Sequence, residues 1–127
     1  MELCGKKILV VDDEEGFREI LTEEFQDCGA EVISTSSGLS AFEVFKTVKF
    51  DAVVSDIRMP NGDGIYFLDQ ILNAKFILPV FVFITGYAEF DENEIKEKGV
   101  ASVFTKPFEI TKLVKFLATE LHSYDKA

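Results

Sequence analysis

Residues 8–14 read Ile8-Leu9-Val10-Val11-Asp12-Asp13-Glu14, an unbroken apolar run that ends in three acidic residues. Four consecutive apolar residues are typical of a strand that is buried on both faces of a parallel sheet. The apolar positions that follow recur at helical spacing: Phe17, Ile20, Leu21 and Phe25. Gly29 suits the left-handed residue that often ends a helix. This stretch therefore predicts a buried strand followed by a helix.

The same alternation of a short apolar run and a longer amphipathic run continues through the chain. Four further strands are expected, at residues 32–33, 52–55, 80–84 and 102–105. Helices are expected between and after them, over Leu39–Val48, Ile65–Leu72, Ala88–Lys98 and Ile110–Leu121. Because parallel strands need crossover helices, this order predicts a doubly wound α/β fold, a five-stranded parallel sheet with helices on both faces. We expect one domain over residues 1–127, with no effector domain.

Composition restricts the classes of function. The net charge of −10 would repel a phosphate backbone, so direct nucleic-acid binding is not expected. Two cysteines, Cys4 and Cys28, stand at no metal-ligand spacing, and we expect them to be reduced. The sequence shows neither a signal peptide nor an apolar run of membrane-spanning length. These features predict a cytoplasmic protein that meets cations and protein partners, with no membrane contact.

Polar residues gather where the predicted strands end, and the carboxyl edge of an open parallel sheet is where ligands bind. The residues at these ends are Asp12, Asp13, Asp56, Thr85 and Lys106. If the three aspartates converge, each pair repels by about 3 kcal/mol at an effective dielectric constant of 20. A bound cation would relieve this repulsion. An all-oxygen site with few protein ligands suits Mg²⁺, or Mn²⁺ in its place.

A phosphoryl donor fits the same set of residues. Asp56 would be the nucleophile and would form an acyl phosphate, while the metal offsets the developing charge. The Lys106 ammonium and the Thr85 hydroxyl would bind the remaining phosphoryl oxygens. Taken singly, these residues have plainer explanations: the acidic pair could cap the first helix, and Asp56 could be a turn residue. Four strands that end in suitable residues together favour a site.

The motifs that carry this chemistry resemble the receiver domain of two-component response regulators, most closely the stand-alone, chemotaxis-regulator-like kind. They are residues 8–14, Asp56-Ile57-Arg58-Met59-Pro60 with Asp63-Gly64, Thr85-Gly86, and Lys106-Pro107-Phe108. The resemblance covers essentially the whole chain. It implies a flavodoxin-like (βα)₅ fold and a signalling domain that is not an enzyme, beyond catalysing its own phosphorylation and dephosphorylation.

The resemblance also implies a role for each site residue. Asp56 would be the phosphorylated aspartate, and Thr85 and Lys106 would bind its phosphoryl group. The metal ligands would be the carboxylates of Asp12, Asp13 and Asp56, with Asp12 acting partly through water, and the backbone carbonyl of Arg58. The donor would be a phosphohistidine on a sensor histidine kinase or a histidine phosphotransfer protein. The Lys106–Pro107 peptide bond would be cis.

We expect the signal to leave through the surface formed by the fourth helix, fifth strand and fifth helix, to which a downstream protein would bind. The chain itself is expected to be a monomer or a weak dimer. Val103 departs from the family, which often has Tyr or Phe three residues before the conserved lysine. Phe104 should face the core instead, because neighbouring strand residues point to opposite faces. The polar fourth helix or Tyr87 would then carry the signal. Arg58 and Tyr87 occupy positions that influence acyl phosphate hydrolysis in this family.

Three other functions are compatible with an α/β fold of this size. A flavin mononucleotide carrier needs a phosphate loop rich in Ser, Thr and Gly after the first strand, where this chain is acidic. A haloacid-dehalogenase-like phosphatase typically has a second aspartate two residues after its nucleophile, where this chain has Arg58, and a cap domain is lacking. A receiver-like docking module that works without phosphorylation remains the alternative.

Overall fold

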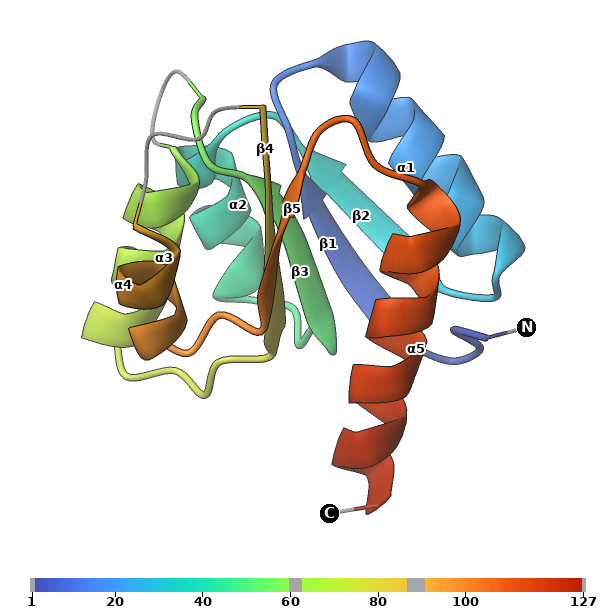
Figure 1. Cartoon of the computed structure of the whole chain (residues 1–127). Helices are drawn as coiled ribbons and strands as arrows, with labels where there is room; N and C mark the ends of the chain where they lie inside the picture. Colours follow the sequence, from blue (N-terminus) through green and yellow to red (C-terminus); the bar gives the residue numbers. More distant parts are fainter. Residues whose placement is uncertain (1, 60–62, 87–90, 127) are drawn as a thin grey trace.

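Strands and helices alternate along the computed structural model, which describes residues 2–59, 63–86 and 91–126, the last four by their backbone alone (Figure 1). The elements are β1 (Lys7–Val11), α1 (Glu15–Asp27), β2 (Glu31–Thr35), α2 (Gly38–Phe45), β3 (Ala52–Asp56), α3 (Gly64–Asn73), β4 (Val80–Thr85), α4 (Glu92–Glu97), β5 (Ser102–Thr105) and α5 (Ile110–Lys126).

The strands form one five-stranded parallel sheet in the order β2-β1-β3-β4-β5. Helices α1 and α5 cover one face of the sheet, and α2, α3 and α4 cover the other (Figure 1). The predicted doubly wound fold is therefore confirmed. The strand order reverses direction between β1 and β3, and in such sheets ligands bind in the crevice outside the carboxyl ends at that point.

The two faces of the sheet build two separate cores. Ile8 and Val10 of β1 pack with Phe25 and Leu117 on the side of α1 and α5. Leu9 and its neighbours on the opposite face pack with α2, α3 and α4. Burying one large apolar side chain of this kind contributes about 1.5–3 kcal/mol. Within the described residues, no helix combines the length and apolarity that crossing a membrane requires.

Some boundaries differ from those that the sequence predicted. The fourth helix begins at Glu92 instead of Ala88, because the Asp91 carboxylate caps it and accepts hydrogen bonds from the amides of residues 93 and 94 at 3.0 and 3.3 Å. The predicted signal carrier Tyr87 and residues 88–90 of the predicted helix lie outside the described residues.

Helix α2 ends at Phe45, and Val48 lies in the loop that follows. Two apolar residues that matched the helical pattern are exposed, Ile20 by 52% and Leu39 by 50%. The helical spacing of apolar residues therefore predicted α1 and α2 correctly, but it assigned more residues to their buried faces than the sheet covers. Gly29, at φ +94°, occupies the left-handed position after α1 as predicted.

Candidate functional site

The three predicted aspartates come together at the carboxyl edge of the sheet, around the point where the strand order reverses. Asp12 directly follows β1, and Asp56 is the last residue of the neighbouring strand β3. One carboxylate oxygen from each of Asp12, Asp13 and Asp56 lies within 4.8 Å of the other two. Parallel strands thus deliver acidic groups that are 44 positions apart in sequence to one small volume.

Asp12 is held in place by its own neighbourhood. Its side chain is 2% exposed, and one oxygen, Oδ1, accepts a hydrogen bond from the Glu14 amide at 2.8 Å. The Arg18 guanidinium donates to the Asp12 backbone carbonyl at 2.7 Å. This hydrogen bond reaches the amide of Glu14, the residue before α1, and no amide of the helix itself, so it does not support the helix-capping explanation. The other oxygen, Oδ2, lies 3.7 Å from the Lys106 Nζ and belongs to the site.

A glycine at the start of α3 allows the chain to close tightly behind Asp56. The Gly64 amide donates to the Ile57 carbonyl at 2.8 Å. A Cβ atom at Gly64 would collide with the Asp56 carbonyl oxygen and would lie 2.7 Å from the Phe83 ring. Any other residue would force β3 and α3 apart, so the position of Asp56 depends on this glycine.

Burial and repulsion perturb the acidic groups. The pKa of Asp56 is raised from 3.8 to about 6, first by desolvation and then by the nearby Asp12 charge, against the opposing effect of Lys106. Burial is also the main cause that raises the pKa of Asp12, while the Glu14 amide and Lys106 oppose it. Both pKa values are raised mainly because burial disfavours the ionised carboxylates, and the Lys106 ammonium offsets this cost only in part.

Thr85 ends β4, the strand beside β3, and Lys106 follows β5, the next strand outward. The Lys106 amide donates to the Thr85 carbonyl at 2.8 Å, which ties the end of β5 to the end of β4. The Lys106 Nζ lies 3.7 Å from Asp12 and 3.7 Å from Asp56, longer than a good charge-assisted hydrogen bond. Thr85 is buried, and the Lys106–Pro107 peptide bond is cis, as the resemblance implied.

Phe17 belongs to this site as well, although the sequence pattern marked it only as an apolar residue of the first helix. The Lys106 Nζ lies over the Phe17 ring, 4.3 Å from its centroid. The Phe17 ring also makes a T-shaped contact with the Phe108 ring, at a centroid distance of 6.2 Å. The sequence feature that could have marked Phe17 as a site residue is its position one helical turn after Asp12 and Asp13.

The donor set fits a hard divalent cation. All candidate ligand atoms are carboxylate oxygens, they span at most 4.8 Å, and two of the three groups have raised pKa values. Mg²⁺ prefers such oxygen ligands and keeps several waters when few carboxylates bind it. Arg58 lies two residues after Asp56 with an exposed side chain, and its carbonyl as a further ligand stays a prediction.

Comparison with known proteins identifies the family. The family model of the response regulator receiver domain matches residues 8–118. This chain is a response regulator receiver domain. Sporulation initiation phosphotransferase F of Bacillus subtilis is 33% identical over 112 residues, which cover 87% of this chain and 90% of that protein. The alkaline phosphatase synthesis transcriptional regulatory protein PhoP of the same species is 37% identical over 104 residues, or 82% of this chain and 43% of PhoP.

Solved receiver structures agree with the fold. The chemotaxis response regulator CheY4 of Vibrio cholerae superposes with a TM-score of 0.80 at 26% identity, covering 91% of this chain and 98% of that one. TrrA of Thermotoga maritima, solved in complex with Mg²⁺-BeF, superposes with a TM-score of 0.74 at 30% identity, covering 88% and 98%. Receiver domains bind Mg²⁺ at an acidic cluster, and this receiver carries such a cluster.

The receiver's unusual β5 residues lie on opposite faces of the sheet, as predicted. Phe104 packs against the core under α1 and α5, with ring contacts to Phe108 at 5.5 Å and Phe116 at 5.8 Å. Val103 is half-buried and packs against the core under α2, α3 and α4. Phe104 therefore cannot replace the family's aromatic residue on the α4 side of the sheet.

Proposed function

We propose that this receiver accepts a phosphoryl group on Asp56 from the phosphohistidine of a histidine kinase or phosphotransfer protein. The observation that carries the proposal is the convergence of three aspartates with Lys106, whose Nζ lies 3.7 Å from both Asp12 and Asp56. A purely structural ion pair would not need three carboxylates around one ammonium. A phosphoryl-transfer site does, because it must bind a cation and stabilise anionic oxygens.

In the proposed reaction an Asp56 carboxylate oxygen attacks phosphorus and forms the P–O bond of an acyl phosphate. The P–N bond to the donor imidazole breaks, and the ring nitrogen keeps the electron pair and takes up a proton. Asp56 must be ionised to attack, and its side chain is 12% exposed, so a donor can reach it while bulk water is largely excluded.

The other residues orient and balance the charges. Lys106 would move from its shared position between Asp12 and Asp56 to the phosphoryl oxygens, and the Phe17 ring would keep its ammonium near the site. Thr85, on the neighbouring strand, would donate its hydroxyl to another oxygen. Mg²⁺, held by Asp12, Asp13, Asp56 and the Arg58 carbonyl, would supply charge neutralisation when bound, and Mn²⁺ would substitute.

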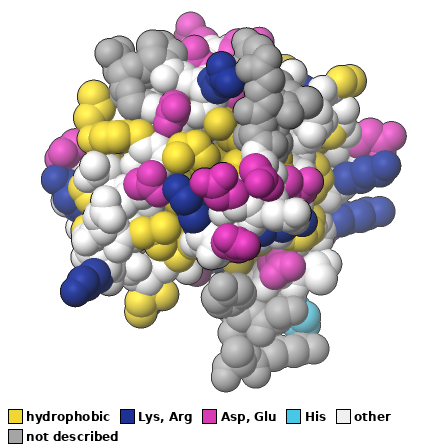
Figure 2. All heavy atoms as spheres, turned by 60° about the vertical axis from the view of Figure 1, so that its left-hand side comes forward, with side chains coloured by type: hydrophobic (Ala, Val, Ile, Leu, Met, Phe, Trp, Pro, Cys, Tyr) yellow, Lys and Arg dark blue, Asp and Glu magenta, His cyan; other side chains and the backbone are white. Residues whose placement is uncertain are grey.

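We further propose that the signal leaves through α4, β5 and α5 to a protein partner. Support comes from the packing of α4, in which Ile95 is the buried residue. Acidic side chains gather across the face that Figure 2 brings forward. Glu92, Glu94 and Glu97 of α4 are exposed. Weakly packed elements are the ones that shift at low cost, and β5 beside α4 is an edge strand.

The test is phosphorylation with acetyl phosphate, followed by intact-mass measurement. The wild type should gain one phosphoryl group when Mg²⁺ or Mn²⁺ is present and none with a chelator. Asp56→Asn should gain none under either condition. Asp27→Asn removes the same charge from the exposed end of α1 and should behave as the wild type. A wild type that stays unmodified with Mg²⁺ contradicts the proposal.

Val103 favours one alternative, a receiver that docks to its partner regardless of phosphorylation. The family's aromatic residue at this position couples the phosphoryl site to the output surface, and a half-buried valine cannot swing in the same way. A partner that binds phosphorylated and unphosphorylated protein equally well would favour this docking function.

A further inference from the structure

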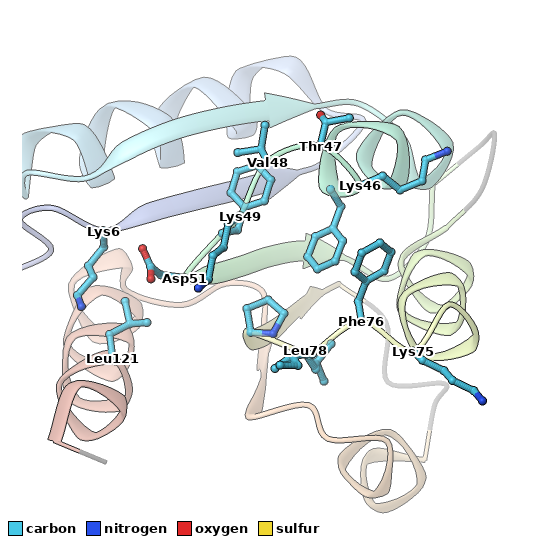
Figure 3. A pocket seen from close by; sticks show the side chains of 14 residues that line it. Lys6, Lys46, Thr47, Val48, Lys49, Asp51, Lys75, Phe76, Leu78 and Leu121 are labelled. Atoms are coloured by element: carbon cyan, nitrogen blue, oxygen red, sulfur yellow. The ribbon is translucent and has the colours of Figure 1, made fainter.

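A second concave site lies at the opposite edge of the sheet from Asp56. A cavity of about 720 Å³ opens at the amino ends of β3 and β4 (Figure 3). Its walls are the segments 45–51 and 75–79, with Lys6 and Leu121 at one end. This volume is in the range of sites that hold one small organic ligand, roughly 300–1,000 Å³.

The cavity has an apolar lining, part of which solvent reaches. Phe45 and Phe50 are buried in it, with their rings stacked at 6.3 Å. Phe76 packs edge-on against Phe45 at 5.6 Å, yet 40% of it is exposed. Ile77 is 93% exposed. The exposed side chains of Phe76 and Ile77 beside the cavity form an apolar surface that an apolar ligand would cover.

The charge around this cavity opposes that of the whole chain. Four lysines and one aspartate line it, in a protein whose net charge is −10. Figure 3 shows Lys6 and Lys49 on either side of Asp51 at one end, with Lys46 and Lys75 directed outward at the other. Asp51 accepts the Lys7 amide at 2.8 Å, and Lys46 pairs with Glu43 at 3.0 Å. Within the described residues, Lys49 and Lys75 form no ion pair.

Lys75 is also an exception among the helix ends. It directly follows Ala74, the C-cap residue of α3, and its φ of +62° lies in the left-handed region. The corresponding residues after α1 and α4 are Gly29 and Gly99, which adopt this conformation without strain. A lysine at the one position beside the cavity, against the backbone preference, indicates that its charge has a use there.

These features indicate which kind of molecule binds in the cavity. A second copy of the chain, joined by a two-fold contact here, would bring lysines against lysines, which opposes association. The volume fits one compact ligand. The lining combines apolar walls with the ammonium groups of Lys49 and Lys75, which form no ion pair with any other described residue. We propose that this cavity binds a small apolar anion, with an aromatic or short acyl body and one carboxylate. Binding in this cavity should not depend on phosphorylation, because the cavity lies at the amino ends of β3 and β4 and Asp56 lies at the carboxyl end of β3.

The test uses 2-naphthoate as the probe and amide chemical shifts in two-dimensional NMR as the readout. Saturable shifts should map to residues 46–51 and 75–79. The neutral 2-naphthylmethanol should bind about ten-fold more weakly, which corresponds to about 1.4 kcal/mol. Asp56→Asn should bind the probe as tightly as the wild type, so this result stands apart from the outcome at the phosphoryl site.

Two variants and a matched control make the test specific. Combined Lys49→Gln and Lys75→Gly should weaken naphthoate binding about ten-fold, and the glycine relieves the left-handed strain, so the fold should not suffer. Lys112→Gln with Lys115→Gln removes the same charge from exposed positions of α5 and should leave binding unchanged. The absence of mapped shifts at millimolar naphthoate, equal binding of the neutral analogue, or equal weakening in the control pair would each overturn the proposal.

Discussion

Replacing Asp56, the proposed phospho-acceptor, should stabilise the metal-free protein. The folded state raises the pKa of Asp56 from 3.8 to about 6, so ionising this carboxyl costs free energy in the folded protein that it does not cost in the unfolded chain. A shift of about 2 pKa units corresponds to about 3 kcal/mol. Asp56→Asn removes that cost, because the amide carries no charge to desolvate or to repel Asp12.

The pH dependence follows from the direction of the shift. Between pH 4 and pH 6 the folded protein binds more protons at Asp56 than the unfolded chain, so the wild type loses stability as the pH rises. Well below pH 3.8 the carboxyl is neutral in both states and the cost disappears. The stability gain of Asp56→Asn should therefore be small near pH 4, grow through pH 6 and level off at up to about 3 kcal/mol.

Urea unfolding in the presence of a chelator measures this gain. With a slope of roughly 2 kcal/mol per molar urea, the midpoint of Asp56→Asn should exceed that of the wild type by about 1.5 M at pH 8. Added Mg²⁺ should stabilise the wild type more than the variant, because the cation binds the folded carboxylate cluster. Asp27→Asn should follow the wild-type curve. A gain that is absent, or that does not change between pH 4 and pH 8, would refute this reasoning.

Three further substitutions test how the site is built. Gly64→Ala should lower the free energy of unfolding by about 1–3 kcal/mol and slow phosphorylation, since its Cβ displaces Asp56. Urea unfolding and acetyl phosphate kinetics measure both effects. Gly86→Ala is the stability control, because its Cβ would meet no atom of the described residues within 4 Å. Phe17→Leu should slow phosphorylation about two- to five-fold, because it removes the aromatic ring under the Lys106 ammonium. Phe17→Tyr keeps a ring and should restore the rate. An equal loss of rate in both variants would contradict the cation–π role. Lys106→Ala should still accept phosphate but lose the partner's preference for the phosphorylated form, which a pull-down measures; an unchanged preference would show that another residue senses the charge.

The fold and the central residues could be read from the sequence because each strand leaves a local pattern. Apolar runs such as residues 8–11 mark buried parallel strands, and the residue after each run must then lie at the carboxyl edge. The convergence of Asp12, Asp13 and Asp56 follows from topology alone, without any knowledge of side-chain conformation. Val103 and Phe104 were assigned to opposite faces by the same two-residue period.

Other features depend on contacts between distant segments, which a local pattern does not contain. The cation–π contact of Phe17 joins α1 to the end of β5, and the helical period only marks Phe17 as apolar. The exposure of Ile20 and Leu39 depends on how far the sheet reaches under α1 and α2. The cavity beside Phe76 and Ile77 forms where two loops meet at the amino edge, and each loop alone is unremarkable.

The most direct test of the central claim is to locate the phosphoryl group on the chain. Protein phosphorylated with acetyl phosphate and Mg²⁺ is reduced with borohydride, which converts an aspartyl phosphate to homoserine, and is then analysed by peptide mass spectrometry. Phosphorylation of Asp56 should give homoserine at position 56, and the peptide should stay unmodified when Mg²⁺ is withheld. Homoserine at position 12 or 13, or a phosphoryl group recovered on a histidine or serine instead, would contradict it.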